Sequence, residues 1–288
     1  MRPAAPVGGR RGKQLRSAVR TVRERRPATH GRAGDPELVA LVEEPYSSVE
    51  ETHRRLESLL SAYEAREDRR AVFLSIYVRM TGAVAGRLRG DEFEDPEWVG
   101  EYLVAFANLY RAAVHDYETG ALDSLADPWQ LAFEAAERGD SLVLQDAMLG
   151  VNAHINYDLS LAVHDADVRP DPDAKYADHS RITDVIAAIL DESQDGLVER
   201  GADGLGTLDD SLGRLDEWLS VLTIDECRDS AWRTAIALNS RLGPRRRLAR
   251  WINDVTSTGA AYLILSSKTS DLVHDALRDL EGTSEGWN

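Results

Sequence analysis

The hydrophobic positions of this chain recur every three or four residues, and runs that alternate with a period of two are nearly absent. Helix start signals interrupt this pattern. Asp35-Pro36, Asp95-Pro96 and Asp127-Pro128 each place a capping carboxylate before a proline at the first helical position, where a missing N–H costs nothing. Ser48 and Glu51 form a capping box before another apolar stripe. The pattern predicts an all-α protein.

Glycines after the last apolar positions of several stripes mark helix ends. Together these signals predict a single-domain helical bundle of about nine helices within residues 35–288. The helices are expected near residues 36–43, 48–66, 70–89, 96–117, 128–138, 141–164, 180–199, 208–222, 226–241 and 245–280. The stretches Asp165–His179 and Gly201–Gly206 are predicted to be surface loops, and neither marks a domain boundary.

Charge separates a tail from this domain. Residues 1–34 hold 10 of the 34 Lys and Arg residues and 1 of the 50 Asp and Glu residues, so the tail carries +9 and the remainder −25. We expect the basic tail to be disordered or loosely helical. The acidic body repels nucleic acid and anionic lipid, which excludes both as its partners. Acidic excess with only three lysines is also typical of proteins from a salt-loaded cytoplasm, so the sequence predicts a halophilic source.

Cysteine use and hydropathy concern the cellular location. Cys227 is the only cysteine, so no intramolecular disulfide can form, which favours a reducing cytoplasm. No run of eighteen apolar residues exists, and the arginine-rich start lacks the apolar stretch of a secretory signal. The sequence therefore predicts a cytoplasmic protein without a transmembrane segment and makes no prediction of its oligomeric state.

The segment Gly150–Leu159 holds the densest set of polar residues in an apolar setting. At about 100° per residue, apolar side chains cover most of this predicted helix, so its polar groups need partners inside the core. His154 and Asp158 are four residues apart on one flank of the apolar face, and Asn152 and Asn156 occupy the other flank. The two pairs point apart, so they cannot line one small site.

The two pairs have different predicted roles. A histidine and a carboxylate one turn apart suit a divalent-metal site or a proton-transfer pair, which makes His154 and Asp158 the candidate catalytic residues. Their alternative role is a hydrogen-bonded pair within the core. Asn152 and Asn156 are predicted to be structural or substrate-lining, because an amide can bridge to neighbouring backbone.

A metal would need further ligands from other helices. Asp116, near the end of one predicted helix, and Asp178, at the start of another, are the candidates, with helix capping as their alternative role. The sequence contains no HExxH motif and does not contain two ExxH motifs, so the usual zinc-peptidase and di-iron signatures are missing. This absence weakens the metal interpretation.

Aromatic residues at helical spacing could line an apolar pocket beside His154, although such stripes are often ordinary core. Tyr77 is the candidate for a catalytic role in that pocket, and Tyr110 and Trp129 are candidates for its lining. The wider set contains Trp98, Phe106, Tyr117, Phe133 and Trp232.

Two segments carry a family resemblance: Phe73–Val84, with its Tyr-x-x-Met-Thr core, and Asn152–Val163, which reads NAHINYDLSLAV. They resemble the family catalogued as domain of unknown function five-nine-nine-five, which occurs in halophilic archaea and actinobacteria. The resemblance covers about residues 46–265 and leaves the basic tail outside. It implies an all-α fold and no particular activity.

Two functions follow as hypotheses. The first is a metal- or His/Asp-dependent enzyme of hydrolase type that acts on a small or lipid-like substrate in an aromatic-lined pocket. The second is a non-enzymatic helical module that binds a ligand or a protein, in which the polar helix is structural. The sequence favours the first, because several polar groups lie in one buried segment.

Overall fold

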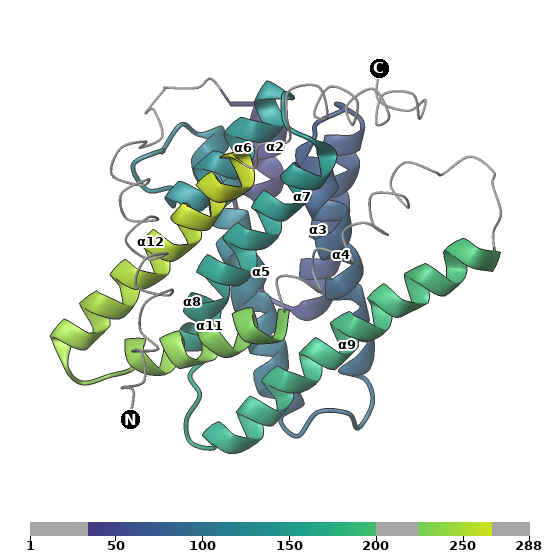
Figure 1. Cartoon of the computed structure of the whole chain (residues 1–288). Helices are drawn as coiled ribbons and strands as arrows, with labels where there is room; N and C mark the ends of the chain where they lie inside the picture. The colour runs from purple at the N-terminus through teal and green to yellow at the C-terminus, as the bar shows by residue number, and fades with distance from the viewer. Residues whose placement is uncertain (1–33, 200–223, 267–288) are drawn as a thin grey trace, which may run out of the picture.

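The computed structural model describes residues 34–199 and 224–266, with backbone alone for residues 187–199 (Figure 1). All regular structure in these residues is helical, which confirms the predicted all-α fold. The tail, the Gly201–Gly206 connection and the predicted helix 208–222 lie outside the described residues. In the described part of the chain, no helix is both long enough and apolar enough to cross a membrane.

Helices in the first half of the chain begin close to the predicted caps, but Asp127 is not a cap: it lies in the first turn of its helix, and the N-cap residue is Ala126. Asp35 accepts a hydrogen bond from the backbone N–H of Glu37 at 2.8 Å, and Asp95 accepts one from Trp98 at 3.0 Å. Ser48 likewise caps its helix by accepting from the N–H of Glu51 at 3.2 Å. These helices are α2 (Pro36–Val42), α3 (Val49–Glu64), α4 (Arg70–Arg87), α5 (Pro96–Glu118) and α6 (Asp127–Arg138).

The predicted helix 141–164 is one continuous rod with an irregular centre. It consists of α7 (Val143–Val151), the π-helical segment η1 (Asn152–Asp158) and α8 (Leu159–Asp165). At the end of η1 the N–H of Leu159 donates to the carbonyl of His154, five residues earlier instead of four. If this rod counts as one helix, the described residues form nine helices.

The C-terminal helices differ from the prediction at one point. They are α9 (Pro172–Glu199), α11 (Ile224–Leu238) and α12 (Gly243–Ser266). Helix α9 begins at Pro172, not near residue 180, so the predicted loop Asp165–His179 is shorter than expected. Asp171-Pro172 repeats the start signal of the earlier helices, and the Asp171 carboxylate accepts from the N–H of Ala174 at 3.3 Å.

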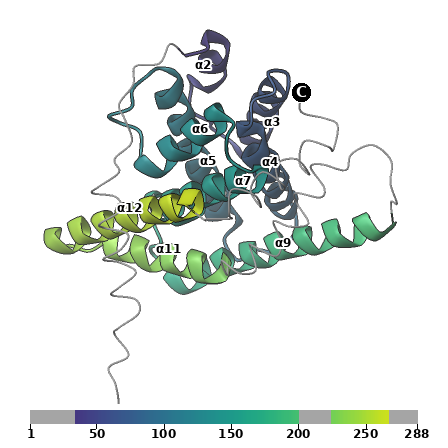
Figure 2. The same cartoon turned by 45° about the horizontal axis from the view of Figure 1, so that its top comes forward.

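The rod α7-η1-α8 lies at the centre of the bundle. Helices α4, α5 and α6 contact it on one side, while α11 and α12 contact it on the other, and α9 packs across α4, α5 and α11. Figures 1 and 2 show α11 and α12 side by side as an antiparallel pair, with the long α9 running beside α11. The polar groups of η1 are therefore enclosed by helices from both halves of the chain.

A buried ion pair joins three of the N-terminal helices. Arg70 Nη1 of α4 lies 2.5 Å from Glu118 Oε1 of α5, and Glu118 Oε2 accepts from the N–H of Asp35 at 3.0 Å, at the start of α2. Arg70 also bonds to Asp68 and lies over the ring of Tyr63 at 4.5 Å. The charged groups of this network all have partners. The network stabilises the end of the bundle that lies away from the cavity described below.

Gly150 is required by close packing between α7 and α4. A Cβ at this position would lie 2.3 Å from Phe73 Cγ, and the Phe73 ring is itself enclosed by Tyr77, Tyr110 and Trp129. We expect Gly150→Ala to lower the free energy of unfolding by about 1–3 kcal/mol through overpacking, as measured by urea denaturation. The control is Gly86→Ala in α4, where nothing lies within 4 Å and stability should stay equal or rise. Equal effects of the two substitutions would contradict this account.

Candidate functional site

The predicted pair His154 and Asp158 forms a hydrogen bond inside the core. His154 Nδ1 lies 3.1 Å from Asp158 Oδ2, and each residue is only 2% exposed. The imidazole stacks on Phe106 with ring centroids 3.6 Å apart and meets the edge of Tyr77 at 4.4 Å. These contacts hold the ring in one orientation.

Trp129 of α6 is the second partner of the same carboxylate oxygen. Its indole Nε1–H donates to Asp158 Oδ2 at 2.8 Å. An indole N–H can only donate, so this oxygen acts as an acceptor, which favours a His154 tautomer with its proton on Nδ1. The lone pair then lies on His154 Nε2, and this buried nitrogen has no hydrogen-bond partner among the described residues.

Burial also controls the charges of the pair. Loss of solvation raises the pKa of Asp158 well above its ordinary value, and the hydrogen bond from Trp129 opposes this rise. Burial lowers the pKa of His154 well below its ordinary value. The histidine is therefore held neutral at physiological pH, which is the state that a general base needs.

The second pair of the polar segment faces α12. Asn156 Nδ2 donates to Asn152 Oδ1 at 3.0 Å, and Asn152 Nδ2 donates to the carbonyl of Ser257 at 2.9 Å. Asn253, one turn earlier in α12, donates to the carbonyl of Tyr157 at 3.0 Å. The bond from Asn253 satisfies a backbone carbonyl at the irregular centre of the rod, and the bond from Asn152 satisfies one in α12. The prediction for the two asparagines left open a structural and a substrate-lining role, and the contacts here are with α12 and with each other.

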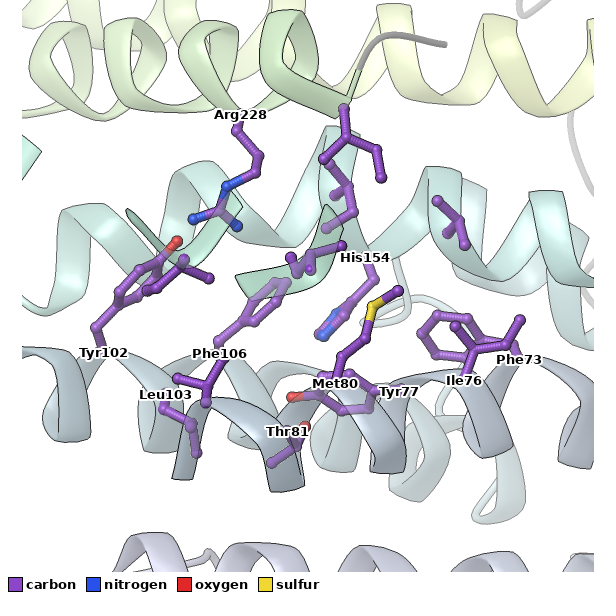
Figure 3. A pocket seen from close by; sticks show the side chains of 16 residues that line it. Phe73, Ile76, Tyr77, Met80, Thr81, Tyr102, Leu103, Phe106, His154 and Arg228 are labelled. Atoms are coloured by element: carbon purple, nitrogen blue, oxygen red, sulfur yellow. The ribbon is translucent and has the colours of Figure 1, made fainter. Parts of the chain in front are cut away.

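An apolar cavity of about 80 Å³ lies beside His154, between α4, α5, η1, α9 and α11. Figure 3 shows the imidazole reaching into it between Phe106 and Tyr77. Most lining side chains are aliphatic or aromatic, and the polar ones are Tyr77, Thr81, Tyr102, His154 and Arg228. The Tyr77 hydroxyl is buried beside the side chain of Thr81, which lines the same cavity.

The predicted aromatic residues divide into two groups. Tyr77 and Phe106 line the cavity, whereas Tyr110 and Trp129 contact the His154 ring from outside the cavity lining, with centroid distances of 6.1 and 5.9 Å. Trp129 is therefore a supporting residue through its bond to Asp158. Trp98 and Trp232 belong to a separate part of the core, beyond Tyr102.

The structure does not bring Asp116 and Asp178 to His154. Asp116 lies at the end of α5, 3.5 Å from His115, and Asp178 caps the start of the same helix by accepting from the N–H groups of Glu94 and Asp95 at 2.8 and 2.7 Å. The described residues contain no group of three His, Cys, Asp or Glu side chains able to hold a metal. The proposed four-ligand set is thus not assembled among the described residues, because Asp178 binds backbone N–H groups at the start of α5 and Asp116 pairs with His115.

Arg228 is the cavity residue that the sequence analysis missed. It stands in the charged run Asp225–Asp229, which indicates an exposed helix start. Its position nevertheless falls on the buried stripe of α11, with Ala231, Trp232, Ala235 and Leu238. That spacing of three and four residues was the available signal, and Arg228 is only 3% exposed.

The fold and the site define an all-helical protein with a buried His–Asp pair beside an apolar cavity. The chain belongs to the family of unknown function DUF5995, whose sequence model matches residues 49–267. The resemblance expected over about residues 46–265 is thereby confirmed. Comparison with the curated proteins found no match, and neither did comparison with the solved structures.

The buried carboxylate predicts a pH-dependent stability difference between Asp158→Asn and the wild type. A carboxyl whose folded pKa is raised stabilises the fold fully below its unfolded pKa, and this contribution is lost as pH rises through the folded pKa. The asparagine does not titrate. We therefore expect the free energy of unfolding of the variant, relative to wild type, to increase from pH 4 to pH 8 by about 1.4 kcal/mol for each unit of pKa elevation.

Urea denaturation at pH 4, 6 and 8 measures this difference. Asp165→Asn removes an exposed carboxylate from the same rod and controls for the change of net charge. The prediction is wrong if the free energy of unfolding of Asp158→Asn, relative to wild type, stays constant or decreases as pH rises. Either result would show that the ionised carboxylate is the favoured buried form.

Proposed function

We propose that this protein is a His/Asp-dependent enzyme of hydrolase type that acts on a small, mainly apolar substrate in the cavity beside His154. One observation carries the proposal: a buried histidine that is oriented by a carboxylate through Nδ1 and presents an unpartnered Nε2 at an apolar cavity. A base oriented by a third group is the arrangement that general-base catalysis uses. The cytoplasmic location, expected from the single cysteine, is part of this proposal.

In the proposed reaction His154 activates a water molecule against an ester carbonyl. Nε2 takes a proton from the water as its oxygen bonds to the carbonyl carbon, and the bond from Nδ1–H to Asp158 Oδ2 keeps the resulting imidazolium in its orientation. The bond from that carbon to the alcohol oxygen then breaks, and Nε2 returns the proton to the departing alcohol. The products are a carboxylic acid and an alcohol, without any oxidant or reductant.

Tyr77 is the proposed donor to the oxygen that becomes negative. Burial raises the pKa of its hydroxyl well above the ordinary value, so the group keeps its proton. Its ring adjoins that of His154 at 4.4 Å, and its hydroxyl lies beside Thr81 at the same cavity. A preorganised donor of this kind stabilises a developing oxyanion in a dry site.

The proposed role of the site is proton transfer and not metal binding. His154 and Asp158 supply two groups, and the described residues gather no third ligand beside them. A non-enzymatic ligand-binding protein is the second candidate, supported by the mainly apolar lining of the cavity and by the structural contacts of the asparagine pair.

Hydrolysis of small aliphatic esters, from methyl acetate to ethyl butanoate, tests the proposed function with substrates of a size that suits the cavity. We expect measurable turnover by the wild-type protein and a decrease in kcat of about 10²–10⁴-fold in His154→Gln, which keeps a polar side chain but removes the base. Tyr77→Phe removes one oxyanion donor and should lower kcat by roughly 10²-fold. The release of the carboxylic acid is followed by titration at constant pH.

His115→Gln is the matched control, because His115 lies on the partly exposed end of α5 and its loss should leave turnover unchanged. Circular dichroism and a urea midpoint for each variant separate loss of chemistry from loss of folding. Equal turnover by His154→Gln and the wild type, or no turnover of any ester, would reject the enzymatic proposal and leave the ligand-binding candidate.

A further inference from the structure

Arg228 is a buried cation that has no carboxylate partner among the described residues. It is 3% exposed, and no described Asp or Glu oxygen lies within 4 Å of its guanidinium. The nearest acid along α11, Asp229, instead accepts from Tyr176 and Arg233. Buried charges in proteins are normally paired, because an isolated ion loses its solvation without compensation. The other buried arginine, Arg70, follows this rule with two carboxylates.

The hydrogen-bond partners of Arg228 are all uncharged groups. Nε donates to Thr183 Oγ1 at 2.8 Å, and Nη2 donates to the carbonyl of His179 at 2.7 Å. Nη2 also lies 3.5 Å from His179 Nδ1, and the guanidinium interacts with the Tyr102 hydroxyl. These bonds satisfy donors of the guanidinium but do not neutralise its charge. Figure 3 shows the guanidinium directed from α11 towards Tyr102, on the same pocket as His154.

The polar neighbours of Arg228 stay neutral and cannot balance its charge. His179 Nε2–H donates to the backbone carbonyl of Arg228 at 3.2 Å, and burial, together with the arginine charge, lowers the pKa of His179 well below its ordinary value. The Tyr102 hydroxyl donates to His179 Nδ1 at 3.2 Å, and burial raises the pKa of Tyr102 to about 12 although Arg228 opposes the rise. The positive charge is therefore held rigidly at the wall of an apolar cavity.

We propose that the cavity binds a monocarboxylate with a short apolar body, whose carboxylate pairs with Arg228. A planar carboxylate matches the guanidinium and neutralises its single charge, whereas a dianionic phosphate would leave one charge in an apolar cavity. The aliphatic side chains of Ile155, Ile182 and Ile224 line the space for the apolar body.

The cavity volume limits the size of this ligand. A site needs about 10–15 Å³ for each water-sized group, so about 80 Å³ accommodates roughly five to eight such groups, and hexanoate has eight non-hydrogen atoms. Hexanoate is therefore a suitable probe. This inference rests on the proposed function, and it names the substrate class of the proposed enzyme. The substrate is a short apolar acid that places its carboxylate at Arg228 and a hydrolysable ester towards His154.

Binding of hexanoate and hexanamide to the full chain, measured by isothermal titration calorimetry, tests the inference without any turnover. The two probes have the same apolar body and differ in charge. We expect hexanoate to bind the wild-type protein at least tenfold more tightly than hexanamide. Equal affinities, or tighter binding of hexanamide, would overturn the inference.

Two variants locate the source of this preference. Arg228→Met keeps an unbranched stem but removes the charge, so the preference for hexanoate should disappear while hexanamide still binds. Arg233→Met removes an arginine whose side chain is 71% exposed on the same helix and should leave the preference intact. Retention of the preference in Arg228→Met would also overturn the inference. The comparison of the two probes on the wild-type protein stands even if Arg228→Met fails to fold.

The two proposals fail in different experiments. Arg228-dependent hexanoate binding without hydrolysis of any ester supports the carboxylate site and rejects the enzyme. Hydrolysis that depends on His154, with equal affinity for hexanoate and hexanamide, supports the enzyme and rejects the carboxylate site.

Discussion

The buried carboxylate of Asp158 is the constraint on which the rest of the site depends. A carboxylate in an apolar core must find donors there, since each unsatisfied lone pair costs free energy that packing has to offset. Trp129 and His154 supply two donors to one oxygen. Because these bonds fix the indole and the imidazole, the aromatic side chains around them have little freedom. The orientation of the His154 ring thus follows from its hydrogen bond to Asp158.

The same requirement explains the partnership between η1 and α12. A π-helical turn changes which carbonyl each N–H reaches, so carbonyls at its edges need other donors. Asn253 donates to one of them, and Asn152 donates in return to α12 at Ser257. The polar residues of the segment therefore divide by direction. The asparagines connect the rod to α12, while His154 and Asp158 face the aromatic side chains of α4, α5 and α6.

The polar groups at the cavity that the core does not fully match are the basis of the proposed function. In a core where most polar groups are partnered, two groups at the cavity stand out: His154 Nε2 has no hydrogen-bond partner among the described residues, and the charge of Arg228 has no carboxylate beside it there. Unsatisfied groups in native cores are uncommon and require an explanation. A ligand that presents an anion to Arg228 and a polar reacting group to His154 would satisfy both. This matching gives the proposed chemistry and the proposed ligand one physical basis.

Much of the architecture follows from local sequence, because helix caps and apolar spacing involve residues within a turn of one another. Asp35, Ser48 and Asp95 were predicted to cap helices and do so. The bond between His154 and Asp158 was also predictable, since residues four apart meet on any helix. The start of α9 at Pro172 was readable from Asp171-Pro172 but was assigned to a loop.

Tertiary structure decided the features that depend on distant residues. The sequence determined that His154 and Asp158 would form a pair, but their third partner, Trp129, lies 29 positions from Asp158 and shares no local pattern with it. Asp178 became a cap for α5 because folding brought it to two free N–H groups. Arg228 is charged like its exposed neighbours, and only the packing of α11 on the rod placed it inside. Caps and apolar spacing, which are local, determine where the helices form. Burial arises only when the helices pack together, so the tertiary structure determines which polar groups lie at the cavity.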